Sequence, residues 1–151
     1  MRPAAILSAL AAACLSAGCL ALHDPLNLEG SFHRHQRGFS ADVRWGEWEK
    51  AAEYVEPDGR AEFDALARAL ADFRVTDYEV REVRLDERRS SAIAVVVYQG
   101  YEASLPVERE VVVTQRWRHD EDHGRWYVTP DADLAGKLGA AGFRTAPVGT
   151  R

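Results

Sequence analysis

The chain has 151 residues, 24 of them acidic and 19 basic, with a formal net charge of −5 at neutral pH. This length suits one domain. Charges of both signs are spread along the chain without a basic block, which argues against a nucleic-acid partner. The sequence has no glycine-rich phosphate loop and no other motif that implies a cofactor.

The amino-terminal 18 residues have the order of a bacterial targeting segment. Arg2 supplies positive charge, and Ala4 to Leu15 is a run of Ala, Ile and Leu interrupted only by Ser8 and Cys14. Such a run is shorter than the ~20 residues that a membrane-spanning helix needs. The segment is therefore predicted to be a signal peptide rather than a membrane span.

The sequence LSAGC at residues 15–19 resembles the lipobox of bacterial lipoproteins, although its leucine stands four residues before Cys19 rather than three. In that family the cysteine thiol receives a diacylglyceryl group, the leader is cut before the cysteine, and acyl chains such as palmitate complete the anchor. The resemblance implies a lipid anchor at Cys19 in the cell envelope. Leu20 stands where enterobacterial inner-membrane lipoproteins carry Asp, which favours the outer membrane, facing the periplasm. A plain signal peptide before a chance cysteine, or an uncleaved amphipathic anchor, remains the alternative.

The two cysteines are then accounted for, because Cys14 leaves with the leader and Cys19 is acylated. The domain is expected to have no disulfide, although its compartment would permit one. Residues 19–31 are interpreted as a lipidated tether and residues 32–138 as the domain. Residues 139–151, rich in Gly, Ala, Thr and Pro, are interpreted as a flexible carboxy-terminal tail.

Helices are predicted in the first half of the domain. Residues 32–44 form a weakly amphipathic segment that ends before Gly46. Two further helices follow from apolar residues at helical spacing, with a break at Pro57 and Gly59. The apolar residues are Trp48, Ala51, Ala52 and Val55 in the second helix, and Phe63, Leu66, Ala67, Leu70 and Phe73 in the third.

Strands are predicted in the second half, where the apolar period changes to two. The phase shifts within residues 78–85, which predicts a bulge near Arg81 and Glu82. Residues 91–101 are apolar on both faces and should form a central strand. Residues 107–118 and 125–129 complete a four-stranded antiparallel meander, since the connections are too short for crossovers. Helices followed by a curved antiparallel sheet make an α+β fold.

These segments resemble the NTF2-like (cone-fold, SnoaL-like) superfamily over about residues 32 to 130. The features that carry the resemblance are Gly46-Glu47-Trp48 between two helices, Ala51-Ala52, the break at Pro57-Asp58, and a final hairpin with Trp117, Gly124 and Trp126. The resemblance implies helices packed into the concave face of the sheet, often around an apolar pocket. It is nearly silent on function, because the superfamily contains both enzymes and binding modules.

Six polar or aromatic residues are candidates for the lining of such a pocket. They are Trp45, Trp48, Tyr78, Tyr98, Gln115 and Trp117. The alternative is that these aromatic side chains simply fill the core, with their polar atoms hydrogen-bonded. No acid or histidine shares the strand rows of Tyr98 and Trp117, and Asp77 and Glu79 flank Tyr78 and so point to the other face. No catalytic residue is therefore predicted.

The loop HDEDH at residues 119–123 contains metal-ligand residue types, but polar residues and a glycine are also what a hairpin turn requires. No metal site is predicted there. His33 and His35 lie two apart on a helix and could not chelate together.

The sequence thus predicts a lipid-anchored envelope protein with a non-enzymatic binding or scaffold domain. The ligand is a small apolar molecule or a partner protein of the envelope, and a homodimer is left open. The alternative is a small cone-fold enzyme of the isomerase, hydrolase or dehydratase type that acts on an apolar ligand.

Overall fold

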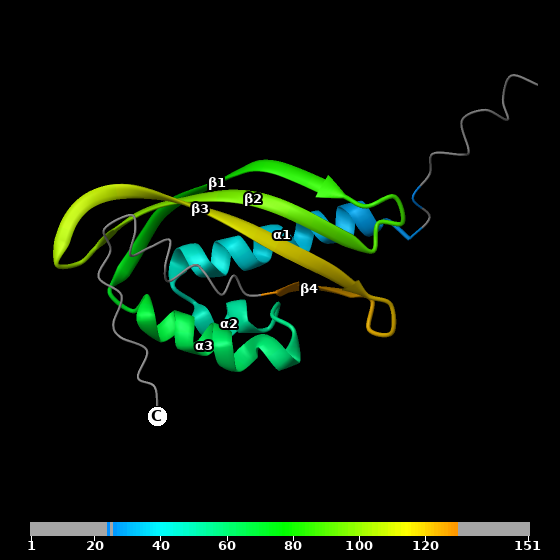
Figure 1. Cartoon of the computed structure of the whole chain (residues 1–151), viewed down its shortest axis with the longest axis horizontal. Coiled ribbons are helices and arrows are strands. Elements are labelled where there is room, and N and C mark those ends of the chain that lie inside the picture. Colours follow the sequence, from blue (N-terminus) through cyan, green and yellow to red (C-terminus); the bar gives the residue numbers. More distant parts are fainter. Residues whose placement is uncertain (1–23, 25, 130–151) are drawn as a thin grey trace, which may run out of the picture.

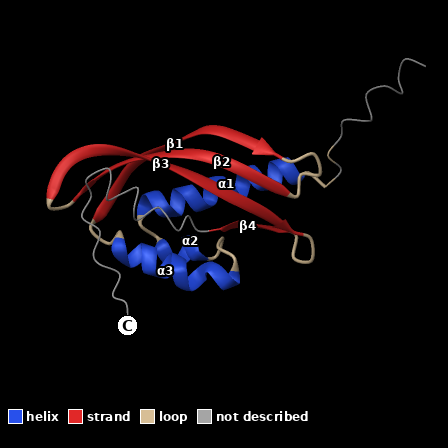
Figure 2. Cartoon of the chain, viewed as in Figure 1, coloured by secondary structure: helices blue, strands red, loops and turns tan. Residues whose placement is uncertain are grey.

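The computed structural model describes residue 24 and residues 26–129, which form an α+β fold (Figures 1 and 2). The predicted leader, Cys19 and the tail at 139–151 lie outside the described residues. The elements in chain order are α1 (Leu28–Trp45), α2 (Trp48–Ala52), the 3-10 turn η1 (Pro57–Gly59), α3 (Arg60–Ala69), β1 (Phe73–Leu85), β2 (Ser91–Glu102), β3 (Leu105–Asp120) and β4 (Arg125–Thr129).

Helix α1 begins four residues before the predicted start at residue 32 and takes in the end of the predicted tether. Asp24 explains this, because its carboxylate accepts a hydrogen bond from the backbone N–H of Glu29 at 2.9 Å. Backbone hydrogen bonds, chiefly that of Glu29, lower the pKa of Asp24. The bond occupies one of the free N–H groups that every helix start exposes. Gly46 ends the helix with a positive φ of 70°, where glycine is favoured.

The four strands form one open antiparallel sheet in the order β1-β2-β3-β4. The predicted bulge is confirmed, since the register between β1 and β2 shifts between Val80 and Glu82. A second shift lies between Val75 and Asp77. The prediction that β2 is central is also confirmed, as β2 pairs with β1 on one side and with β3 on the other.

Two of the predicted helix ends were wrong. The third helix was expected to include Phe73, but α3 ends at Ala69 and Phe73 begins β1, where it pairs with Glu102. The second helix was expected to reach Val55, but α2 ends at Ala52. Val55 instead forms a parallel bridge to Val128, with the backbone N–H of Val128 donating to the carbonyl of Tyr54 at 2.8 Å. In both places the helix ends early because the backbone of the following residues pairs with a strand of the sheet.

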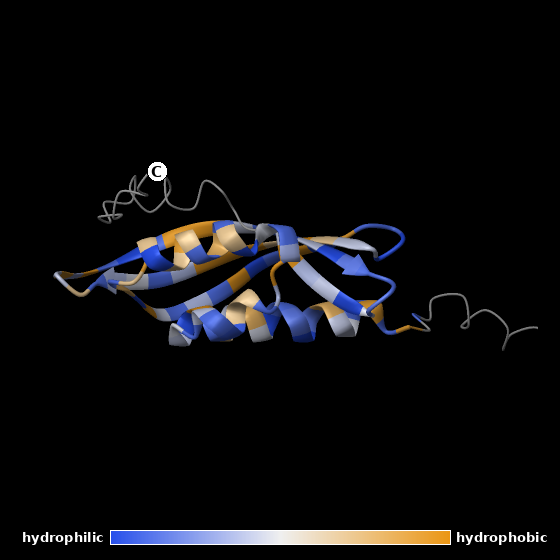
Figure 3. Cartoon of the chain, turned by 90° about the horizontal axis from the view of Figure 1, so that it is seen from below, coloured by the Kyte–Doolittle hydropathy of each residue, from blue (hydrophilic) through white to orange (hydrophobic). Residues whose placement is uncertain are grey.

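The helices cover one face of the sheet (Figure 2). The hydrophobic core is formed by side chains from the helices and from the sheet. Figure 3 shows the alternation of hydrophilic and hydrophobic residues along the helices and strands that this arrangement requires. Helix α1 contributes four buried side chains, Phe32, Gln36, Phe39 and Ser40. From the sheet, the core takes alternate residues of β2 and β3, namely Ala92, Ala94, Val96 and Tyr98, and Val111, Val113 and Trp117. Two of these four α1 side chains, Gln36 and Ser40, are polar although they are buried.

Candidate ligand-binding cavity

An apolar cavity of about 60 Å³ lies between the helices and the inner face of the sheet. Its wall includes aromatic and aliphatic side chains from all three α-helices and from all four strands. They are Phe39, Val43, Trp48, Phe63, Leu66, Leu70, Phe73, Val75, Tyr98, Val111, Val113 and Val128, together with Thr114, Gln115 and Thr129. None of these lining residues is acidic, basic or histidine. The cavity therefore offers an apolar surface and, through Tyr98 and Gln115, contact with one buried polar cluster.

That polar cluster joins α1 to β2 and β3 through uncharged side chains. Its members are Gln36 and Ser40 on α1, Tyr98 on β2, and Gln115 and Trp117 on β3, all of them buried. The amide nitrogen of Gln36 donates to the Ser40 hydroxyl at 3.0 Å, and that of Gln115 donates to the Tyr98 hydroxyl at 3.0 Å. Bonds of this kind let polar groups remain in a core without an unsatisfied donor or acceptor.

The orientation of the Gln115 amide follows from Trp117. The indole Nε1–H of Trp117 can only donate, and it lies 3.2 Å from Oε1 of Gln115. The oxygen of Gln115 must therefore face Trp117, where it also accepts from Gln36 Nε2 at 3.4 Å. The amide nitrogen consequently faces Tyr98 and Ser40, its second contact being Ser40 Oγ at 3.4 Å.

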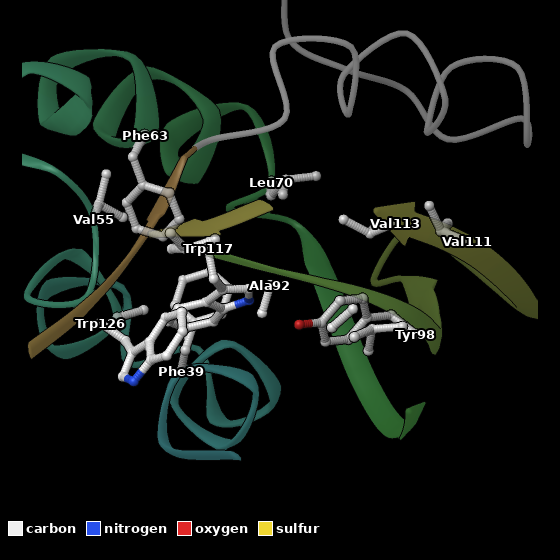
Figure 4. Packing of buried hydrophobic residues seen from close by; sticks show 14 of the residues in the cluster. Phe39, Val55, Phe63, Leu70, Ala92, Tyr98, Val111, Val113, Trp117 and Trp126 are labelled. Carbon is white, nitrogen blue, oxygen red and sulfur yellow. The ribbon is translucent and has the colours of Figure 1, made fainter. Parts of the chain in front are cut away.

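Tyr98 is held as a neutral phenol. Burial raises its pKa well above the ordinary value of a tyrosine, and the hydrogen bonds to Ser40 and Gln115 only partly oppose that shift. Figure 4 shows its hydroxyl directed toward Phe39 and Trp117, away from Val111 and Val113. At neutral pH this group is available as a hydrogen-bond donor and cannot serve as a base.

The structure brings together four of the six candidate pocket residues. Trp48, Tyr98 and Gln115 line the cavity, and Trp117 is hydrogen-bonded to Gln115 behind the wall. Tyr78 is half-buried, with its ring centroid 6.1 Å from that of Tyr98. Trp45 does not reach the cavity. Its side chain is 72% exposed at the end of α1, with the guanidinium of Arg44 stacked 5.3 Å from a ring centroid.

Gln36 and Ser40 belong to the site but were not predicted. The available signal was their spacing, since they share a helical face with Phe32 and Phe39 and so should be buried with them. Two polar residues in the middle of an apolar stripe indicate either a break in the stripe or a buried polar cluster. Their partner Gln115 lies 79 residues from Gln36 and 75 from Ser40 along the chain, so no local pattern joins them.

The acidic residues Asp42 on α1 and Asp77 and Glu79 on β1 lie away from the cavity wall. Asp77 pairs with Arg44 at 3.6 Å and Glu79 with Arg81 at 3.4 Å. Asp42 has a raised pKa, caused by desolvation and then by the nearby negative charge of Glu47. It does not line the cavity. Among the described residues, no carboxylate is thus positioned at Tyr98 or Gln115.

The HDEDH segment spans the end of β3, where His119 and Asp120 pair with Trp126 and Arg125 of β4, and the first part of the turn between the two strands. Asp120 accepts hydrogen bonds from the backbone N–H groups of Asp122 and His123, and its Oδ2 lies 2.9 Å from Nδ1 of His123. The side-chain bond of His123 lowers the pKa of Asp120. In the part of the chain that the structure describes, no group of three or more potential ligand residues is arranged to hold a metal ion.

The outer face of the sheet differs in character from the cavity. Arg81 on β1 reaches across β2 to Glu110 on β3, with Nη2 and Oε2 3.7 Å apart. Val97 on β2 is 1% exposed although it is not part of the core cluster. Val97 pairs with Glu79 on β1 and Val112 on β3, the two strands that carry this charged bridge, and we therefore expect it to lie beneath the bridge. Two large apolar residues remain exposed on that face, Ile93 on β2 and Val112 in the middle of β3.

Comparison with known proteins gives information on the fold alone. No family model matches the sequence, and no curated protein matches it. Among solved structures, the chain is similar to the solution structure of a SEC-C motif containing protein from Rhodopseudomonas palustris. The TM-score is 0.52 at 15% sequence identity, over 64% of this chain and 73% of that one. At this identity the likeness indicates a shared arrangement of helices and sheet.

Proposed function

We propose that this protein is a lipid-anchored envelope lipoprotein whose domain is an NTF2-like cone that binds a small apolar molecule without transforming it. The observation that carries the proposal is the cavity between the helices and the inner face of the sheet. It is lined by aromatic and aliphatic side chains and contacts a neutral polar cluster through Tyr98 and Gln115. Apolar pockets with a few convergent polar groups are the usual form of small-molecule sites.

Binding is favoured over catalysis by the charge state of the site. A general base must come within hydrogen-bond reach of the proton that it removes. The described lining contains no carboxylate or imidazole, and burial keeps Tyr98 protonated. The cavity can therefore hold and orient a molecule, but its wall offers no group that would take a proton at neutral pH.

Binding in the cavity is also favoured over docking of a protein on the outer sheet face. Ion pairs and charged side chains occupy much of that face, including the bridge from Arg81 to Glu110. The exposed apolar residues Ile93 and Val112 lie on neighbouring strands without forming a register pair, since Ile93 is opposite Arg116 and Val112 is opposite Val97. A broad apolar patch would be expected for a stable partner.

The anchor is supported by the lipobox-like sequence and by the way the domain begins. Cys19 precedes Asp24 by five residues, and Asp24 already takes part in the start of α1. A chain of five residues spans at most about 18 Å. No helix among the described residues is long and apolar enough to cross a membrane. An acylated Cys19 would thus hold the domain close to the outer-membrane surface, with each buried methylene contributing about 0.8 kcal/mol.

Two neighbouring valines provide a test of the binding site. Val113 is 6% exposed and lines the cavity, whereas Val112 is 48% exposed on the opposite face. Val113→Phe should fill the cavity and abolish the binding of a small neutral apolar probe such as isobutene, followed by NMR titration. Val112→Phe adds the same side chain outside the cavity and should leave the binding unchanged. Equal binding by both variants would contradict the cavity as the site.

The anchor is tested separately by Cys19→Ala. We expect this change to abolish the incorporation of labelled palmitate and to remove the protein from the outer-membrane fraction, or to leave it uncut on its leader. Palmitate labelling that persists in the Cys19→Ala protein would exclude the lipobox interpretation.

A further inference from the structure

In the polar cluster, more donors are directed at the hydroxyl oxygen of Ser40 than that oxygen can accept. Three groups direct a donor at Ser40 Oγ. They are Gln36 Nε2 at 3.0 Å, the Tyr98 hydroxyl at 3.3 Å and Gln115 Nε2 at 3.4 Å. A hydroxyl oxygen has two lone pairs. One of the three donors is therefore in excess.

The Tyr98 hydroxyl is the donor that can turn away. The Gln115 amide is fixed by the indole of Trp117, and the Gln36 amide is held between Ser40 Oγ and Gln115 Oε1. The oxygen of Tyr98 accepts from Gln115 Nε2, and its hydroxyl donates to Ser40 Oγ at 3.3 Å, so rotation about the C–O bond can turn the phenolic hydrogen away from Ser40 while the bond from Gln115 is kept. The cluster can therefore release one hydrogen-bond donor, the hydroxyl of Tyr98, and Tyr98 lines the cavity.

On the basis of the proposed function, we infer that the ligand is a neutral molecule with one acceptor oxygen, such as a ketone, an ester or an ether, and that Tyr98 donates a hydrogen bond to this oxygen. A carboxylate ligand is disfavoured, because the described lining offers no Lys or Arg to pair with it and an unpaired buried charge is costly. A hydrocarbon would fill the cavity but would leave the surplus donor unused.

Acetone and isobutene are suitable probes because they are small enough for a cavity of about 60 Å³ and have nearly the same shape, whereas only the ketone has an acceptor oxygen. The chain from Leu20 onward contains every residue that the structure describes, so it retains the whole core. Binding of each probe can be followed by NMR titration of the indole N–H signals. We expect the wild-type domain to bind both probes, and Tyr98→Phe to lower the affinity for the ketone about tenfold relative to that for the alkene.

Two variants separate this role from a structural one. Tyr78→Phe removes the same atom from a neighbouring ring and should leave the ratio of the two affinities unchanged. Ser40→Ala removes the acceptor that competes for the Tyr98 hydrogen and should raise the affinity for the ketone a few-fold, with little effect on the alkene. A merely structural role of the cluster would not produce this gain.

The outcomes distinguish the inference from the function on which it rests. If both probes bind but Tyr98→Phe and Ser40→Ala leave the ratio of their affinities unchanged, the inference is overturned and the apolar site stands. Should neither probe bind to the wild-type domain, both the site and the inference are overturned. Alkene binding by Tyr98→Phe shows that this variant has kept its fold.

Discussion

The inner and outer faces of the same strands follow different physical rules. On β2 and β3, the residues of the core cluster and of the polar cluster beside it are apolar or neutral, and the polar ones are joined by hydrogen bonds between amides, hydroxyls and an indole. The residues that face outward are joined by ion pairs such as that of Arg81 with Glu110. A strand alternates its side chains between faces, so neighbouring residues can be compared directly.

The difference identifies the face that can recognise a ligand. A neutral cluster in a core can present a hydrogen bond to a buried molecule without the cost of desolvating a charge. Exposed ion pairs contribute little free energy and are screened by salt. The inner face should therefore govern stability and binding, and the outer face should tolerate substitution. Two predictions test this comparison, and a third tests the turn that joins β1 to β2; they follow from the largest expected effect to the smallest.

The largest effect is expected from Trp117 compared with Arg118. Trp117 is 2% exposed and packs against Phe32 and Phe39, with ring centroids 5.8 and 5.7 Å away. Trp117→Ala should lower the free energy of unfolding by about 3–5 kcal/mol, because it leaves a cavity and removes the partner of Gln115. Urea denaturation measures the change.

Arg118→Ala is the matched control on the outer face, where Arg118 pairs with Glu56 at 2.8 Å. The expected loss is below about 1 kcal/mol. Comparable losses for the two variants would contradict the distinction between the faces. Because a domain of this size is stabilised by only about 5–15 kcal/mol, the Trp117→Ala variant is best compared at low temperature.

A smaller effect, dependent on pH, is expected from Asp86 in the turn between β1 and β2. Its carboxylate accepts from the backbone N–H groups of Ser90 and Ser91 at 2.7 and 2.9 Å. These bonds, chiefly that of Ser91, lower the pKa of Asp86 below its ordinary value of 3.8. A lowered pKa in the folded state means that the ionised form stabilises the fold above the unfolded pKa. This stabilisation is lost as the pH falls through the lower folded value.

Asp86→Ala should therefore lower the melting temperature at pH ~7, and the difference from the wild type should shrink as the pH is reduced below ~4. Thermal unfolding followed by circular dichroism over this range measures it. Glu87→Ala, in the same turn, is the control, and its difference from the wild type should stay small throughout. A difference for Asp86→Ala that is constant with pH would show that its carboxylate does not act through these bonds.

Much of the fold could be predicted from the sequence because its determinants are local. A period of two predicted the strands, and the phase shift between Tyr78 and Leu85 predicted the bulge after Val80. Helix ends were less predictable where the sheet intervened. Val55 and Phe73 have apolar side chains at helical spacing, yet their backbones pair with Val128 and Glu102.

The candidate site could be predicted only in part, because its geometry depends on contacts between distant segments. Tyr98 and Gln115 were identifiable as polar residues on apolar strand rows, and both line the cavity. Gln36 and Ser40 were missed, since their burial becomes meaningful only when α1 lies over β2 and β3. Trp45 shows the opposite error. An aromatic residue next to a helix end was expected to face inward, but Gly46 ends α1 and leaves the ring in solvent.

The smallest effect is expected on the outer face, where the bridge over Val97 can be tested with two arginines. Arg81 pairs with Glu79 and reaches Glu110 across β2, while Arg84 pairs with Glu82 on its own strand. Arg84→Ala should change the free energy of unfolding by no more than about 0.5 kcal/mol. Arg81→Ala should cost slightly more, up to about 1 kcal/mol, because it also removes the aliphatic stem that we expect to shield Val97 from water.

The excess of Arg81→Ala over Arg84→Ala should persist at 1 M salt, where exposed ion pairs are screened but apolar shielding is not. If the excess disappears in salt, the Arg81 charge rather than its stem stabilises the outer face. If Arg81→Ala costs as much as Trp117→Ala, the outer face has a packed layer of its own. The contrast between a neutral binding face and a tolerant charged face would then have to be abandoned.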